Sequence, residues 1–194
     1  MLRMLSGLSV LLLITLLQGC AGAVVGGAAA GASVVHDRRS AGTVVDDGII
    51  EFKAMEKLIS DKELFGQTHS SVTSYNNILL LSGETPTDAL RSKAFSLVSA
   101  IPKVRKVHNE LVLAAPSSLL TRSSDTWITT KVKTNLFNIK NIEGFDPTRI
   151  KVVSENGTVF LMGIVTREEA EAVVNASRTV KGVQRVVKLF EYLN

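Results

Sequence analysis

The chain has 194 residues, 45% of which are hydrophobic, and a formal net charge of +4. This length suits one medium domain or two small ones, and beyond an apolar start the composition is that of an ordinary globular protein rather than a disordered one. So small a positive excess argues against a nucleic-acid binder, which neutralises phosphates with many Lys and Arg side chains.

The first residues have the features of a lipoprotein signal peptide. Arg3 supplies a positive start, and Leu5–Leu17 is an apolar stretch of signal-peptide length, too short to span a bilayer comfortably. The "LQGC" that follows resembles the bacterial lipobox, and its Cys20 is the only cysteine, so no intramolecular disulfide is possible. We therefore expect residues 1–19 to be cleaved and Cys20 to be lipidated.

Residues 20–44 are expected to form the lipidated cysteine and a tether. The small residues of "AGAVVGGAAAGASVV" have a spacing seen where transmembrane helices touch, but so many glycines disfavour a helix in water. Each buried methylene of an acyl chain contributes ~0.8 kcal/mol, so two or more chains anchor stably. Ala21 stands where an aspartate tends to retain lipoproteins of enteric bacteria in the inner membrane; resemblance to that rule implies the outer membrane, facing the periplasm.

Two internal repeats follow, at residues 45–114 and 124–194, joined by a linker at 115–123. The segment "DDGIIEFKAMEKL" aligns with "SDTWITTKVKTNL", "VTSYNNILLLSGE" with "VVSENGTVFLMGI", and "IPKVRKVHNELVL" with "VKGVQRVVKLFEY". An internal repeat of this kind indicates that one supersecondary unit occurs twice. We therefore expect two tandem domains of the same fold.

Each repeat is predicted to run helix, strand, strand, helix, strand. Asn156-Gly157 is a strong two-residue hairpin signal, and Asn76-Asn77 is its weaker equivalent in the first repeat. The first helix of the second repeat has an apolar face with helical spacing, made of Ile128, Val132 and Leu136. The pattern predicts an α+β fold in which each domain is a three-stranded sheet with two helices on one face (αββαβ).

The positions of several glycines in the two repeats resemble the pattern of a known domain family. Gly83 and Gly163 follow the second predicted strand of each repeat, and Gly182-Val183 precedes the last strand; this pattern resembles the BON domain, although the first repeat departs from it at Lys103. A lipobox followed by two BON domains is similar to the dual BON-domain outer-membrane lipoprotein family. The resemblance implies a non-enzymatic protein that binds anionic phospholipid such as phosphatidylglycerol or cardiolipin. It also implies a role in envelope integrity, at division sites and near the β-barrel assembly machinery.

A candidate lipid-binding surface lies on the first helix of the second repeat. At ~100° per residue, Trp127 points roughly 140° away from the apolar face, with Thr130 and Lys131 near it. Phe137 lies further round and Lys133 on the far flank. An indole favours the headgroup zone of a bilayer, and a lysine near an anionic surface contributes about 1 kcal/mol. The family resemblance implies the same role for this tryptophan and its helix.

The equivalent helix of the first repeat has Ile49 in place of the tryptophan, and its two lysines are balanced by Glu51 and Glu56. Packing alone does not require this difference between the two helices. An alternative remains open, in which the tryptophan packs against the first repeat or against Leu119 and Leu120 of the linker. A second functional hypothesis is a protein-interaction adaptor of the envelope.

No catalytic, cofactor or metal site is expected from the sequence. His36, His69 and His108 are far apart and have no metal-ligand spacing. Acidic residues stand where each repeat's first helix is expected to begin, and we expect them to cap it rather than to form paired catalytic carboxylates. These residues are Asp46 and Asp47 in the first repeat, and Asp125, with Ser124 as its alternative, in the second.

Overall fold

The computed structural model describes residues 37–140 and 142–193. The predicted signal peptide, Cys20 and most of the predicted tether lie outside the described residues. Within the described ranges, no helix is both long and apolar enough to cross a membrane. The compact unit Arg38–Asn194 contains both repeats.

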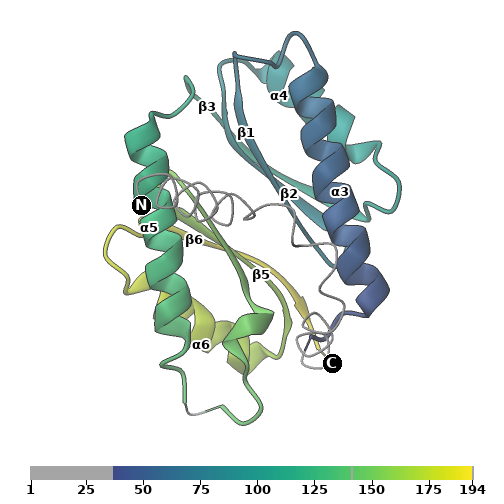
Figure 1. Cartoon of the computed structure of the whole chain (residues 1–194). Helices are drawn as coiled ribbons and strands as arrows, with labels where there is room; N and C mark the ends of the chain where they lie inside the picture. Colours follow the sequence, from purple (N-terminus) through teal and green to yellow (C-terminus); the bar gives the residue numbers. More distant parts are fainter. Residues whose placement is uncertain (1–36, 141, 194) are drawn as a thin grey trace, which may run out of the picture. The chain divides into compact units, whose positions relative to one another are not determined.

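The elements of the first repeat follow the predicted αββαβ order (Figure 1). They are α3 (Ala41–Ser60), β1 (His69–Tyr75), β2 (Ile78–Thr85), α4 (Asp88–Ser99) and β3 (Lys106–Leu113). The second repeat has the same order, with a short 3-10 helix before its first strand. Its elements are α5 (Leu119–Leu136), η2 (Pro147–Arg149), β4 (Lys151–Glu155), β5 (Thr158–Val165), α6 (Arg167–Arg178) and β6 (Arg185–Tyr192).

Both sheets have the same topology, which confirms the predicted duplication. In each, the second strand is central: it pairs antiparallel with the first strand through a tight hairpin and parallel with the third strand across a helix. Asn76, Asn77, Asn156 and Gly157 all have positive φ angles, as a two-residue turn between right-twisted strands requires. The capping box at the start of α6 joins Thr166 and Glu169.

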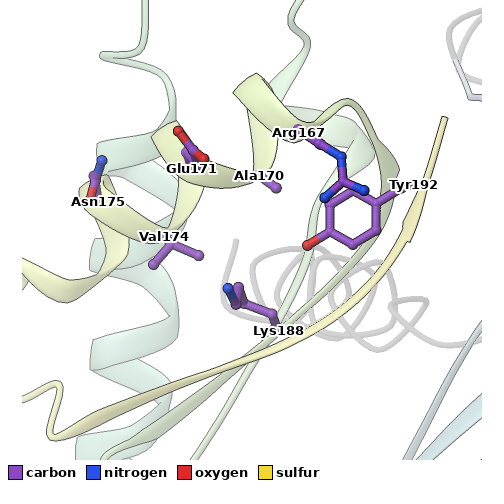
Figure 2. A pocket seen from close by; sticks show the side chains of 7 residues that line it. All are labelled: Arg167, Ala170, Glu171, Val174, Asn175, Lys188 and Tyr192. Carbon is purple, nitrogen blue, oxygen red and sulfur yellow. The ribbon is translucent and has the colours of Figure 1, made fainter. Parts of the chain in front are cut away.

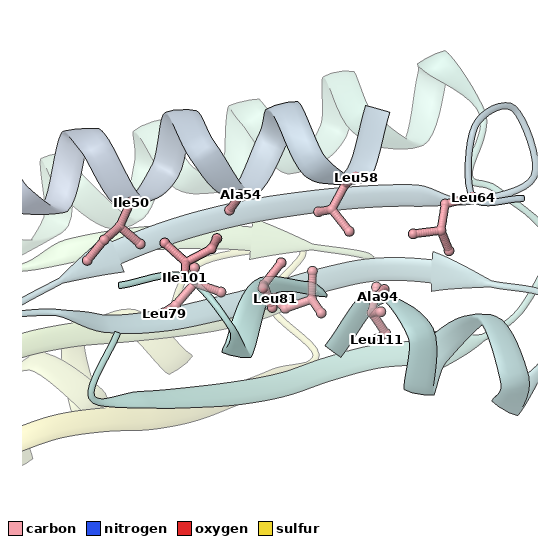
Figure 3. Close-up of a cluster of buried hydrophobic side chains, with 10 residues drawn as sticks. Ile50, Ala54, Leu58, Leu64, Leu79, Leu81, Ala94, Ile101 and Leu111 are labelled. Carbon is pink, nitrogen blue, oxygen red and sulfur yellow. The ribbon is translucent and has the colours of Figure 1, made fainter. Parts of the chain in front are cut away.

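Each sheet packs its own pair of helices on one face. In the first repeat, buried side chains of α3 point at β2, and Ala94 of α4 lies against the same face (Figure 3). The cluster is Ile50, Ala54, Leu58, Leu64, Leu79, Leu81, Ala94, Val98, Ile101 and Leu111. The second repeat has the equivalent cluster, in which Ile128, Val132 and Leu136 form the predicted apolar face of α5. Burying one such side chain stabilises a fold by about 1.5–3 kcal/mol, so these helix faces hold each domain together.

The opposite faces of the two sheets meet in a third apolar cluster. Because side chains alternate along a strand, Leu79 and Leu81 face the helices while Ile78 and Leu80 face the other repeat. Tyr75, Ile78 and Leu80 of the first repeat pack with Phe160, Met162 and Leu189 of the second. The two domains therefore share a buried apolar interface.

The first helix of each repeat begins earlier than the sequence predicts, and the caps predicted for these two helices were wrong. The N-cap of α3 is Ser40 and that of α5 is Ser118; each serine hydroxyl accepts from the amide three residues on. Residues 41–44 of the predicted tether are therefore helical, as is most of the predicted linker 115–123. The aspartates that were expected to cap these helices lie more than one turn inside them.

Two of those aspartates instead bind the hairpin turns. Buried Asp125 accepts hydrogen bonds from the amides of Asn156 and Gly157, both at 2.9 Å. Asp47 accepts equivalent bonds from the amides of Asn76 and Asn77, both at 2.8 Å. Each repeat thus attaches its first helix to its β-hairpin through one buried carboxylate, which satisfies two turn amides that would otherwise be left without partners.

Candidate functional site

The outer face of α5 presents Trp127 to solvent. The side chain is 47% exposed, so it is not enclosed by the first repeat or by linker leucines. Lys131 lies one turn further along, with its Nζ 5.5 Å from the centre of the indole ring, within the range of a cation–π contact. The structure thus brings together the aromatic ring and one of the lysines that the sequence analysis selects.

The other three selected residues lie around this pair on different sides. Phe137 is exposed directly after the end of α5. Thr130 is exposed too, but its hydroxyl donates to the carbonyl of Thr126 at 2.9 Å. Lys133 borders a separate groove of about 370 Å³ that runs along the β4 side of the helix, and Thr130 lines that groove as well. The surface around Trp127 and Lys131 therefore includes fewer residues than the five that were predicted from the sequence.

A leucine in the first turn of α5 extends this surface, and no signal in the sequence marked it as a site residue. Leu119 and Leu120 are 79% and 82% exposed in the first turn of α5. Leu120 precedes Trp127 by seven residues, or two helical turns, and so lies on the same side of the helix. The exposed side of α5 thus carries an apolar stripe with lysine beside it. Its one acidic residue, Asp125, is buried, so no carboxylate opposes those lysines from this helix. We name Leu120, Trp127, Lys131 and Phe137 the α5 surface.

The corresponding side of α3 is also apolar. Ile49, the counterpart of the tryptophan, is 45% exposed and Phe52 is 71% exposed, and Val45 and Ile59 are exposed on the same side. Unlike α5, this helix also carries Glu51 and the exposed Glu56. The first-helix surfaces of the repeats therefore differ in charge more than in apolar exposure.

A hollow of about 330 Å³ lies between α6 and β6 (Figure 2). In Figure 2 the guanidinium of Arg167 lies over the ring of Tyr192, at 5.3 Å from its centre, and Lys188 lies across the hollow from α6. Glu171 on the helix brings a negative charge to the same rim. Two positive charges and one negative charge therefore line this hollow.

At one end of the interface between the sheets, three ionisable side chains from three strands meet. His69 and Glu84 are opposite each other across β1 and β2, and Glu155 comes from the end of β4. Their ligand atoms all lie within 4.8 Å of one another, and the distance from His69 Nε2 to Glu155 Oε1 is 3.6 Å. No sequence motif links these positions, because they meet only when the two sheets pack.

The environment of these three groups shifts two of their pKa values. Burial, together with the charges of Glu84 and Asp125, raises the pKa of Glu155 to about 7, against a smaller opposing effect of Arg122. Burial and the charge of Arg122 lower the pKa of His69, which keeps the imidazole neutral at physiological pH. Negative charge has accumulated here with little positive charge to balance it.

Comparisons with known proteins agree with the duplicated architecture. The family model of the BON domain matches residues 46–115 and 124–194. The chain is similar to the outer membrane lipoprotein DolP of Haemophilus influenzae, with 37% identity over 178 residues, or 92% of this chain and 91% of that protein. It is also similar to the 21 kDa hemolysin of Actinobacillus pleuropneumoniae, with 34% identity over 157 residues, or 81% and 79% of the two chains.

A solved structure of CdsD, a structural protein of the type III secretion system of Chlamydia trachomatis, aligns with 77% of this chain and 92% of its own. The identity is 12% and the TM-score is 0.30, so this similarity is too low to support any conclusion about fold or function.

Proposed function

The chain belongs to the dual BON-domain DolP family, and on that premise we propose that it is a non-enzymatic outer-membrane lipoprotein that docks on anionic phospholipid through α5. Lipidation at Cys20 supplies the main membrane affinity in this proposal, and the α5 surface adds a weaker, headgroup-dependent contact. A tethered surface gains from high local concentration, so a contact that is weak in isolation still determines how the domain sits on the bilayer.

The observation that carries the proposal is an exposed indole beside a lysine on a helix that has no exposed acidic residue. Indole rings favour the headgroup zone, and neighbouring leucine and phenylalanine side chains favour the boundary just below it. Lys131 would contribute about 1 kcal/mol near an anionic surface. This lysine alone would favour anionic over neutral vesicles by about fivefold, since 1.4 kcal/mol is a factor of ten.

The test compares the same substitution on the two equivalent helices. The chain without its predicted signal peptide and lipidated cysteine (residues 21–194), carrying either Trp127→Glu or Ile49→Glu, is mixed with phosphatidylcholine vesicles that contain or lack phosphatidylglycerol. Because the two replaced side chains are almost equally exposed, at 47% and 45%, general effects on folding should match. We expect Trp127→Glu to weaken binding to the anionic vesicles by at least about tenfold, and Ile49→Glu to leave it nearly unchanged.

Equal effects of the two variants, or binding that does not depend on phosphatidylglycerol, would contradict docking through α5. Salt gives a further check. Raising the ionic strength from 0.1 M to 1 M shortens the screening length from about 10 Å to about 3 Å, so binding through Lys131 should weaken.

The exposed side of α3 favours a second function, that of an adaptor for a protein partner. Ile49, Phe52 and Ile59 form an apolar stripe, and acidic residues on the same helix offset its lysines, which suits a protein groove better than an anionic membrane. In this hypothesis the partner belongs to the β-barrel assembly machinery or acts at the division site, as the family resemblance implies. A photo-crosslinking residue at position 52 would capture such a partner in neutral detergent, and Ile59→Glu on the same side of α3 would abolish the capture.

A further inference from the structure

We propose that His69, Glu84 and Glu155 form a binding site for a divalent transition-metal ion of the Zn²⁺ type, at one end of the interface between the two sheets. The site would take one nitrogen and two carboxylate ligands from the protein and leave a coordination position for water. Its ligands come from both BON domains, so a bound ion would join them.

The geometry is close to that of a zinc site. Zn–N and Zn–O distances of about 2.0–2.1 Å place tetrahedral ligand atoms about 3.3 Å apart. The observed separation between His69 Nε2 and Glu155 Oε1 is 3.6 Å, and no pair in the set exceeds 4.8 Å. Shifts of a few tenths of an ångström to about 1 Å, within the reach of glutamate side chains, would close the ligands around an ion.

Glu155 supplies an independent indication. The residue is only 9% exposed, yet within the described part of the chain its carboxylate accepts no hydrogen bond, and the neutral His69 ring lies 3.6 Å from it. A largely buried carboxylate without a hydrogen-bond donor on the protein keeps only the water that reaches it from the groove beside β4, so much of its lost hydration is not replaced. A cation between the three side chains would supply the missing partner.

Glu84 is already held in a position to act as a ligand. It is fully buried, and its Oε2 accepts a hydrogen bond from the amide of Ser117 at 3.1 Å. Its Oε1 accepts from the side-chain amide of Asn156. Partners of this kind orient a metal ligand and tune the affinity for the ion.

The surrounding charges favour a cation. Asp125 adds a third carboxylate near the site, and among residues 37–140 and 142–193 only Arg122 brings a guanidinium that acts on both Glu155 and His69. Arg122 donates to the carbonyl of Ser117 at 3.0 Å. Three carboxylates against one guanidinium leave the site negative when all are ionised. The groove beside β4, which His69 and Glu155 line, provides a route for an ion to enter.

The test uses Zn²⁺ alone, added to the full-length protein purified in detergent and stripped with EDTA. Calorimetry should show one tight equivalent, and Co²⁺ in its place should give visible absorption bands of a low-coordinate site. Mg²⁺ at the same concentration should give no binding, because it prefers an octahedral shell of oxygen ligands and water. Zn²⁺ should also raise the melting temperature in proportion to the logarithm of its concentration.

Two variants remove ligands and two matched variants do not. His69→Gln and Glu155→Gln keep side-chain size and should weaken Zn²⁺ binding by at least about 100-fold, since the loss of outer-shell partners alone costs about 10–100-fold. His108→Gln, on β3, and Glu191→Gln, at the other end of the sheet interface, should leave binding unchanged. Circular dichroism in EDTA establishes that all four variants are folded.

The proposal is overturned if the unmodified protein binds Zn²⁺ no better than His69→Gln does. It is equally overturned if Mg²⁺ binds as tightly as Zn²⁺, or if His108→Gln removes the binding. Vesicle binding through α5 is measured in EDTA, so failure of the metal site and failure of lipid docking are read from different experiments.

Discussion

Asp125→Asn should destabilise the second repeat by about 3 kcal/mol. The buried carboxylate accepts two hydrogen bonds at 2.9 Å, one on each oxygen, from the amides of Asn156 and Gly157. Asparagine keeps one acceptor oxygen but presents an NH₂ group to the other amide. One charge-assisted bond, worth about 1.5–3 kcal/mol, is lost, and a buried amide is left unsatisfied at a cost of about 1–3 kcal/mol. The two costs overlap, because the unsatisfied amide is part of what the lost bond costs. The total is therefore smaller than their sum, at about 3 kcal/mol.

Urea unfolding followed by far-ultraviolet circular dichroism measures this effect. With a slope of about 2 kcal/mol per molar urea, a loss of 3 kcal/mol lowers the midpoint by about 1.5 M. Asp46→Asn is the matched control: its carboxylate forms a surface ion pair with Lys103 at 2.7 Å, and such pairs contribute about 0–1 kcal/mol. Asp125→Asn and Asp46→Asn variants with the same midpoint would refute the conclusion that the buried carboxylate holds helix and hairpin together.

Three further outcomes follow from the same structure. Gly83→Ala should lower the melting temperature of the protein far more than Gly163→Ala does. A Cβ at Gly83 would lie 2.0 Å from a backbone oxygen of β1, whereas the nearest backbone oxygen to a Cβ at Gly163 is 3.2 Å away. Equal melting temperatures of the two variants would contradict this reasoning. Phe160→Ala, in the cluster between the sheets, should cost about 3–5 kcal/mol in urea unfolding, and a loss below 1 kcal/mol would mean that the interface contributes little. Burial raises the pKa of Glu169, but the hydrogen bond from Arg38, a backbone amide and nearby guanidinium charges outweigh it and lower the pKa. The stability from Glu169 is therefore present above its unfolded pKa of 4.5 and lost as pH falls through the lowered folded value, so Arg38→Gln should flatten the acid side of a plot of melting temperature against pH; an unchanged slope would contradict this.

Local patterns were sufficient to predict the duplicated fold. Asn156-Gly157 between two apolar strands specifies a hairpin, and the spacing of Ile128, Val132 and Leu136 specifies one buried helix face. Both signals act over a few residues, and both repeats carry a version of them. A fold assembled from such local choices is readable from a single sequence.

The helix starts were missed because the residues there resemble a linker. The first turn of α5 contains Leu119 and Leu120, which contact no apolar core, and the serine that caps it follows Pro116 in a run typical of loops. The pattern therefore predicted Asp125 or Ser124 as the cap, just before the apolar residues that face the core. The structure shows that this aspartate is needed elsewhere, because the hairpin turn has two amides to satisfy.

The cluster of His69, Glu84 and Glu155 was not predictable at all. Only the antiparallel register places His69 opposite Glu84, and only the packing of the two sheets brings Glu155 to them. A search for ligand spacing within one stretch of chain finds sites built on one element. It does not find a site whose ligands belong to two domains that are each complete on their own.

A comparison of α3 and α5 shows which features the two repeats share and which differ. Asp47 and Asp125 make the same paired bonds to a hairpin turn, so this contact is part of the fold that both repeats need. The solvent-exposed sides of α3 and α5 make no such contact within the fold. Both are apolar, but Ile49 has acidic neighbours on its helix, whereas Trp127 has Lys131 beside it. Since apolar exposure is common to both helices, it does not by itself select a membrane as the partner. The proposed docking on lipid therefore depends on the difference in charge, and for that reason the dependence of binding on anionic lipid, rather than on membranes in general, is the measurement that separates the two surfaces.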